Sequence, residues 1–210
     1  MSGEGKTRRR GYHHGNLRQA LVEATLEMIR ERGPLGFTLA EAAREAGVSA
    51  AAPYRHFSGR EELISEVARQ GFELFAERLE KAWESAGTPL KAFEAVGRAY
   101  LDFARTNPGH YIAMFESGVS VAGNAGLNDA AARAMGVLTR AAEALFAHLP
   151  PDRRPPATMV SHHIWALSHG VVELFARGAP GRRAPFSAED LLESGTAIYL
   201  RGLGLIPHDD

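Results

Sequence analysis

Residues 38 to 63, TLAEAAREAGVSAAAPYRHFSGREEL, constrain the fold more than any other stretch of the chain. Thr38 and Glu41 have the spacing of a capping box, in which each side chain accepts a hydrogen bond from the backbone of the other residue, so a helix should begin at Thr38. Gly47 can adopt the left-handed conformation that ends a helix. Ser49 is a second candidate N-cap and should open a further short helix that runs through Tyr54 to Phe57. The stretch therefore predicts two short helices around a tight turn, followed at once by a longer helix.

Two helices joined by three or four residues, with a glycine in the turn, form the unit that lays its second helix in the major groove of DNA. Short side chains at the start of that second helix must come close to base edges, and here they are Ser49, Ala50, Ala51 and Ala52. Four further side chains could reach phosphate, namely Thr38, Tyr54, His56 and Arg60. Because alanines offer few hydrogen bonds, we expect methyl contacts and DNA shape to carry part of the specificity.

The stretch GVSAAAPYRHFSGREEL also resembles the DNA-binding signature of the tetracycline repressor (TetR) family, and the resemblance covers residues 16 to 76. It implies a homodimeric transcriptional repressor that binds a palindromic operator, with a C-terminal domain that takes a small apolar or aromatic effector. Two residues depart from the family pattern. Arg60 stands where the family usually has lysine, and Pro53 removes one backbone donor near the start of the predicted recognition helix.

The charges of the chain are unevenly distributed. Residues 1 to 60 hold 10 lysines and arginines against 6 aspartates and glutamates, whereas residues 61 to 210 hold 14 against 19. A local basic surplus suits a DNA-binding unit, because phosphate neutralisation supplies most of the sequence-independent affinity. Residues 1 to 15 carry one lysine and three arginines among glycines. We predict a flexible basic arm there, which either enters a minor groove or stays a solvated tail.

No stretch alternates with period two for long enough to indicate a strand, and the abundance of alanine, leucine, glutamate and arginine favours helix. We therefore predict an all-α chain of about nine helices. Residues 16 to 62 should form a three-helix DNA-binding domain with its recognition motif at 38 to 57. Residues 63 to 210 should form a helical bundle, which the family resemblance assigns to ligand binding and dimerisation.

One long helix should join the two predicted domains. Ser58 and Glu61 have the spacing of another capping box, so this helix should begin at Ser58 and continue to about Ser85. At about 27 residues it would be about 40 Å long. Gly71 is its weakest point. A helix of this length can carry a displacement from one domain to the other.

Helical patterns continue at residues 88 to 106, 110 to 117, 128 to 149, 157 to 177 and 187 to 203. The loop between the last two is short, so they should pack antiparallel. Such a pair can stack on its symmetry mate and make a four-helix dimer interface.

An aromatic and methionine set is spread over the middle helices and could line an apolar ligand pocket. It consists of Tyr100, Phe103, Tyr111, Met114, Phe115, Trp165 and His169. Ordinary core packing is the other interpretation of these residues. An enclosed pocket near Phe103 and Trp165 would favour a sensor, and a filled interior would favour a constitutive DNA-binding or interaction module. Trp165, His169 and Gly170 also resemble the Trp-x-x-x-His-Gly (WHG) element of one group of TetR-like C-terminal domains.

Several kinds of chemistry find no support in the sequence. There is no cysteine, which excludes disulfides, thiol switches and Cys-based metal sites. His162 and His169 are about 10 Å apart along a helix, too far to share an ion. No phosphate loop, nucleophile elbow or paired His-Glu motif occurs, so we expect no enzyme, metal or cofactor. No long apolar run or signal peptide pattern occurs, so we expect a cytoplasmic protein without a membrane partner.

Overall fold

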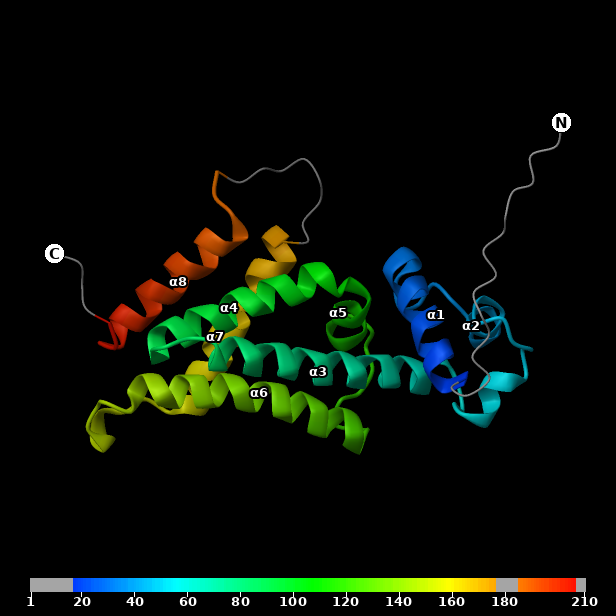
Figure 1. Cartoon of the computed structure of the whole chain (residues 1–210), viewed down its shortest axis with the longest axis horizontal. Helices are drawn as coiled ribbons and strands as arrows, with labels where there is room; N and C mark the ends of the chain where they lie inside the picture. The colour runs from blue at the N-terminus through cyan, green and yellow to red at the C-terminus, as the bar shows by residue number, and fades with distance from the viewer. Residues whose placement is uncertain (1–16, 177–184, 207–210) are drawn as a thin grey trace.

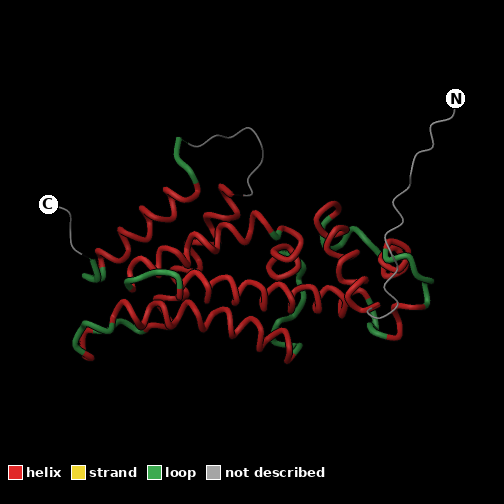
Figure 2. The backbone as a smooth tube through the Cα atoms, in the orientation of Figure 1, coloured by secondary structure: helices red, strands yellow, loops and turns green. Residues whose placement is uncertain are grey.

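The computed structural model describes residues 17–176 and 185–206. The predicted basic arm at residues 1 to 15 lies outside these ranges. All regular elements in the described ranges are helical, as Figure 2 shows. They include eight α-helices, one fewer than the predicted number of about nine. These are α1 (Leu17–Arg32), α2 (Leu39–Glu45), α3 (Arg60–Glu84), α4 (Pro89–Thr106), α5 (Pro108–Phe115), α6 (Ala125–Phe146), α7 (Ala157–Val171) and α8 (Ala188–Gly202).

The start of α2 follows from its own sequence. The Thr38 hydroxyl accepts from the Glu41 N–H at 3.2 Å, and the Glu41 carboxylate accepts from the Thr38 N–H at 2.8 Å. Gly47 then adopts a φ of +74°, a conformation that a residue with a Cβ rarely takes. The capping box and the glycine turn are both confirmed. Each depends on contacts within a few residues, which a local pattern can specify.

The prediction of a recognition helix from Ser49 to Phe57 is wrong. The segment is a turn followed by η1 (Ala52–Arg55), a single turn of 3₁₀ helix. Pro53 lies inside η1, where it offers no N–H and restricts the residue before it, so one α-helix cannot run through it from Ser49. The N–H groups of Ala52 and His56 instead bond to the carbonyls three residues back, those of Ser49 and Pro53, at 3.0 and 2.9 Å. These are the hydrogen bonds of 3₁₀ turns rather than of an α-helix.

The long helix α3 has 25 residues, which makes it about 37 Å long. It begins at Arg60, two residues later than predicted. Gly59 occupies the N-cap position, so Glu62 rather than Glu61 is the third helical residue. The Ser58 N–H and hydroxyl therefore both donate to Glu62, at 2.6 and 2.7 Å, and the predicted pairing of Ser58 with Glu61 is wrong.

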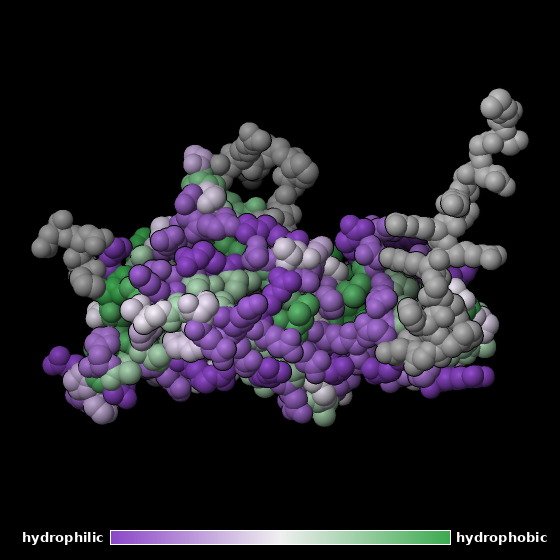
Figure 3. Space-filling view, in the orientation of Figure 1, coloured by the Kyte–Doolittle hydropathy of each residue, from purple (hydrophilic) through white to green (hydrophobic). Residues whose placement is uncertain are grey.

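Figure 1 shows an elongated arrangement in which α1, α2 and η1 lie at one end and α8 lies at the other. The helix α3 runs from the first end along the middle of the molecule and packs against α4, α5 and α6. The helices α7 and α8 pack on each other and on α4. On the face shown in Figure 3 the surface is mostly hydrophilic, with hydrophobic atoms between α5 and α1 and near the end of α8.

Other helix ends also differ from the prediction, among them the start of α6 and the end of α7. The helix α6 begins at Ala125 instead of residue 128, because the Asn124 side chain caps it by accepting from the Leu127 N–H at 3.0 Å. After α7, the predicted helix to residue 177 continues only as a short π-helical segment, η3 (Val172–Ala176). In the described ranges no helix combines the length and the apolar character needed to span a bilayer.

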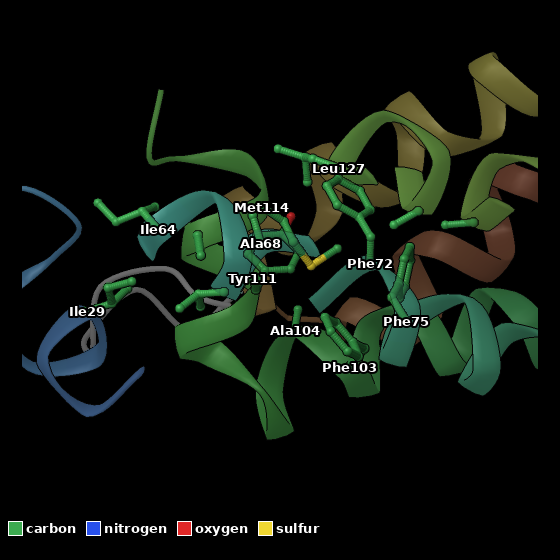
Figure 4. Packing of buried hydrophobic residues seen from close by; sticks show 14 of the residues in the cluster. Ile29, Ile64, Ala68, Phe72, Phe75, Phe103, Ala104, Tyr111, Met114 and Leu127 are labelled. Carbon is green, nitrogen blue, oxygen red and sulfur yellow. The ribbon is translucent and has the colours of Figure 1, made fainter. Parts of the chain in front are cut away.

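The hydrophobic core is continuous from α1 into the bundle. Figure 4 shows Ile29 of α1 and Ile64 of α3 in the same packed cluster as Tyr111 of α5 and Phe103 of α4. The predicted boundary between the DNA-binding domain and the bundle, at residues 62 and 63, falls within this cluster. Side chains of α1, from the first domain, therefore pack against side chains of α3 that belong to the second. A displacement of α3 or α5 must therefore change the packing of α1.

Candidate DNA-binding surface and ligand cavity

The residues predicted to approach base edges lie together, three on the turn before η1 and Ala52 at its first position. Ser49, Ala50 and Ala51 are exposed, whereas Ala52 is half-buried. Tyr54 and His56 follow on the same exposed segment, and Tyr54 is 63% exposed although it is aromatic. Six of the eight predicted DNA-binding residues thus form one surface at the end of the molecule that α1 and α2 occupy. Contact with DNA at these positions stays a prediction.

Thr38 and Arg60, the other two predicted phosphate contacts, are already bonded within the chain. The Thr38 hydroxyl donates to Glu41 at 2.8 Å. The Arg60 guanidinium donates to the Pro34 carbonyl at 3.1 Å and lies 5.9 Å from the centre of the Phe37 ring. Arg60 therefore helps to hold the turn between α1 and α2, whether or not it also contacts phosphate.

Sequence reasoning missed Arg55, which is exposed between Tyr54 and His56. It forms no ion pair with any residue that the structure describes. A cation in this position is well placed for a phosphate, because exposed arginines offer several donors in a planar group. The sequence signal for Arg55 is its place in the run YRHF, between Tyr54 and His56, which were both predicted to contact phosphate.

A buried carboxylate joins α1 to α3 beneath this surface. Glu66 is 6% exposed and accepts from Arg69 twice at 2.8 Å, from Gln70 at 2.8 Å and from Arg18 of α1 at 2.5 Å. Burial by itself raises the pKa of Glu66, but hydrogen bonds from Arg69, Arg18 and Gln70 lower that pKa to about 2. Arg18 also lies 5.2 Å above the centre of the Phe57 ring. The network thus fixes the first helix to the root of the long helix.

In the bundle, four of the seven predicted pocket residues form a hydrogen-bonded cluster. The Trp165 N–H donates to the Tyr100 hydroxyl at 3.0 Å, and the hydroxyl oxygens of Tyr111 and Tyr100 lie 2.8 and 3.3 Å from Nδ1 of His169. Burial raises the pKa of the Tyr100 hydroxyl, and its hydrogen bonds to Trp165 and Tyr111 oppose that rise. The cluster ties together α4, α5 and α7.

The other three predicted pocket residues pack in the core. Phe103 is fully buried with its ring centre 4.9 Å from that of Phe75, and Met114 is buried against Gly71. Phe115 makes an edge contact with Phe72 at 5.5 Å. The space near Phe103 and Trp165 is therefore filled by side chains.

A cavity of about 360 Å³ lies beside this cluster, between α4, α7 and α8. Tyr100 is the one member of the predicted set that lines it. The cavity walls are mainly apolar, and they include Leu90, Phe93, Val96, Leu101, Leu138, Ile164, Leu192, Ala197, Leu200 and Ile206. Sequence periodicity could not have found it, because these residues look like ordinary core positions until the spacing of α8 from α4 is known.

His162 and His169, the two histidines weighed as metal ligands in the sequence, each lie within hydrogen-bonding distance of a protein oxygen. His169 belongs to the tyrosine cluster, and Nδ1 of His162 lies 2.6 Å from the Thr158 carbonyl oxygen. No group of three or more potential metal ligands occurs in the part of the chain that the structure describes.

Two family models match the chain. Residues 21–67 match bacterial regulatory proteins of the tetR family, and residues 93–199, about half of the chain, match the tetracyclin repressor-like C-terminal domain. The chain belongs to the tetracycline repressor family. It is a DNA-binding transcriptional regulator with a helix-turn-helix near its N-terminal end.

Individual relatives of this TetR family regulator extend over most of its length. The transcriptional regulator BetI of Brucella canis is 29% identical over 192 residues, which cover 88% of this chain and 92% of BetI. A protein of unknown function from Rhodococcus sp. RHA1 has a solved structure with a TM-score of 0.77 and 28% identity, covering 92% of this chain and 98% of that one. AibR, solved in complex with isovaleryl coenzyme A and operator DNA, has a TM-score of 0.64 at 17% identity over 87% of this chain and 97% of its own, which shows the shared fold.

Proposed function

We propose that this TetR family regulator is a cytoplasmic repressor that binds a palindromic operator as a homodimer and releases it when a small apolar molecule binds the bundle. The observation that carries the proposal is the cavity between α4, α7 and α8, which shares Tyr100 with the cluster that ties α5 to α7. AibR supports the proposal, since a protein of the same fold was solved with both an acyl coenzyme A and operator DNA.

The DNA-binding part of the proposal assigns residues 1 to 15 to a basic arm, 16 to 62 to DNA binding and 63 to 210 to regulation and dimerisation. Ser49 to Ala52 would approach base edges. Phosphates would be contacted by Thr38, Tyr54, Arg55, His56 and Arg60. The exposure of Tyr54, Arg55 and His56 on one segment supports this assignment.

The dimer part of the proposal rests on apolar side chains that the chain leaves in water. Met159 of α7 and Ile198 of α8 are 55% and 70% exposed, and Leu174 and Phe175 of η3 are also exposed. Large exposed apolar residues gathered on two adjacent helices are typical of an interface. A Cβ added at Gly170 would meet nothing within 4 Å, so a close partner helix is one reason for a glycine there. The hydrogen bonds of Trp165 and His169 support placing the chain in the WHG group.

A constitutive DNA-binding protein without a ligand is the second candidate, and the filled interior near Phe103 and Trp165 favours it. The two functions differ in what the cavity does. A constitutive protein would bind its operator equally well whether the cavity is empty or occupied, whereas a sensor requires two states with different affinities for ligand and operator.

Selection of bound duplexes from random DNA by the full chain tests the function. We expect an inverted repeat whose half-sites lie on one face of the duplex, bound by two protomers. Mass measurement of the complex gives that stoichiometry directly. A selected site without symmetry, bound by a single protomer, would overturn the homodimer and the palindrome together.

A further inference from the structure

The walls of the cavity between α4, α7 and α8 are hydrocarbon over most of their area. Phe93 and Val96 of α4 face Ile164 of α7 and Leu192 of α8 across it. A ligand body of similar character would gain free energy by leaving water, roughly in proportion to the apolar area that it buries. The volume of about 360 Å³ lies within the range of sites that bind small molecules.

One polar group on the buried wall has no partner inside the protein. Ser168 of α7 is 2% exposed and lines the cavity, and its hydroxyl forms no hydrogen bond with any residue in the described ranges. The neighbouring Tyr100 hydroxyl already accepts from Trp165 and faces His169. Because the Ser168 hydroxyl is open to the cavity, a ligand oxygen can exchange a hydrogen bond with it in place of water.

The charged groups that line the cavity nearly balance, with Glu94, Glu189 and Glu193 against Arg98 and Arg201. Glu189 is bonded to Arg105, which is not part of the lining. Arg98 and Glu193 are exposed, and ion pairs with exposed groups contribute little to affinity. A charged head group would therefore meet groups of both signs with little net attraction, and it would lose its hydration if it moved to Ser168.

We infer that this cavity takes a neutral, mainly hydrocarbon molecule with a single hydrogen-bonding oxygen, which bonds Ser168 while the hydrocarbon lies along α4 and α8. The inference rests on the proposed ligand-responsive function and deepens it by naming the chemical class of the effector. Organic anions and organic cations of the same length are excluded by the lack of a buried partner for their charge.

Calorimetric titration of the full chain with decan-1-ol, decanoate and decyltrimethylammonium tests the class, since the probes share a chain and differ in the head group. We expect decan-1-ol to bind about tenfold more tightly than either ion. The variant Ser168→Ala should weaken decan-1-ol about fivefold, as expected for one lost hydrogen bond, and should change decanoate less than about twofold. Ser161→Ala is the matched control, because it removes a buried hydroxyl from the same helix α7 at a position outside the cavity lining, and it should leave decan-1-ol within about twofold.

A cavity-filling variant, Ala197→Phe, tests the location and should abolish binding of decan-1-ol, with circular dichroism as the check on folding. The ligand class is overturned if decan-1-ol shows no binding, if an ion binds as tightly, or if Ser168→Ala has no effect. The location is overturned if folded Ala197→Phe still binds decan-1-ol.

Operator release is measured separately, by fluorescence anisotropy of a selected operator duplex. If decan-1-ol binds the cavity as expected and the operator stays bound at saturation, the ligand class is supported and the proposed ligand response fails. If decan-1-ol releases the operator from wild type and from Ala197→Phe alike, the proposed function stands and the cavity is not the site.

Discussion

The hydroxyl oxygen of Tyr111 lies 2.8 Å from Nδ1 of His169, and this contact ties α5 to α7. The same nitrogen faces the hydroxyl of Tyr100, which lines the cavity. Two residues before Tyr111, α5 crosses α1 closely, because Gly109 packs against the backbone of Leu26. Contacts therefore run without a break from the cavity through α5 to the first helix of the DNA-binding unit, and they give the proposed ligand response a physical route.

Replacing Tyr111 by phenylalanine should interrupt this route without changing the shape of the core. We expect Tyr111→Phe to lower the free energy of unfolding by about 1 kcal/mol, the net value of one buried hydrogen bond. The affinity for decan-1-ol should stay within about twofold, while its effect on operator affinity should shrink. Tyr199→Phe is the control, because the Tyr199 hydroxyl bonds exposed His163 at 2.8 Å and has no contact with α5. An unchanged ligand effect in Tyr111→Phe would exclude this route.

Adding a methyl group at Gly109 should push α1 away from α5. A Cβ there would lie 2.8 Å from the Leu26 carbonyl oxygen, which is backbone and cannot turn aside. We expect Gly109→Ala to destabilise the fold by about 1 to 3 kcal/mol and to weaken operator binding. Gly126 is a matched control in the first turn of α6, where a Cβ would lie 3.5 Å from the Arg69 side chain. Equal stability of the two variants in urea would contradict the close crossing.

Acid should loosen the joint between α1 and α3. The pKa of Glu66 is about 2 in the folded chain and 4.5 in the unfolded reference, so the unfolded state binds the proton first as pH falls. The stability that Glu66 contributes is therefore complete above pH 4.5 and is lost as pH falls toward 2, by about 2 kcal/mol after allowance for solvent around the partly exposed arginines. Urea unfolding across this range should show a flatter profile for Glu66→Gln, whereas Glu23→Gln, at an exposed position of α1, should follow wild type.

Replacing Arg55 should weaken operator binding alone, whereas replacing Arg60 should also lower the stability of the chain. Arg55→Ala should weaken all operators about equally and lower the slope of log affinity against log salt by about one, without changing stability. Arg60→Ala should also destabilise the chain by about 1 kcal/mol, because Arg60 bonds the Pro34 carbonyl. Operator titrations at several salt concentrations, with thermal unfolding of each variant, separate the two effects. An unchanged salt slope removes the residue concerned from the phosphate contacts.

The exposed apolar face of α7 and α8 should hold the proposed dimer together. Ile198→Glu places a charge on α8 where the side chain is 70% exposed in the single chain, and we expect it to yield monomers in sedimentation velocity. Leu35→Glu makes the same kind of change at a 74% exposed residue in the turn after α1 and should leave the dimer intact. A stable dimer of Ile198→Glu would place the interface elsewhere.

Local patterns predicted this chain well wherever the physics is local. The capping box of Thr38 with Glu41 is present, whereas the predicted pairing of Ser58 with Glu61 is replaced by a pairing with Glu62, because the helix begins at Arg60. Pro53 shows the limit of such patterns. Its loss of a backbone donor was foreseen, but the local pattern did not distinguish an α-helix from one turn of 3₁₀ helix.

The sequence by itself determined the all-helical fold, the helix-turn-helix and the long joining helix, because helix periodicity, caps and turn residues act within a few positions. Tertiary structure alone decided which side chains line a cavity and which fill the core. Phe103 and Leu192 are both strongly apolar, yet one packs on Phe75 and the other lines the cavity, because that difference depends on how α4, α7 and α8 are arranged around it. The unpartnered Ser168 hydroxyl arises in the same way, since whether a serine in a helix finds a partner depends on helices far along the chain.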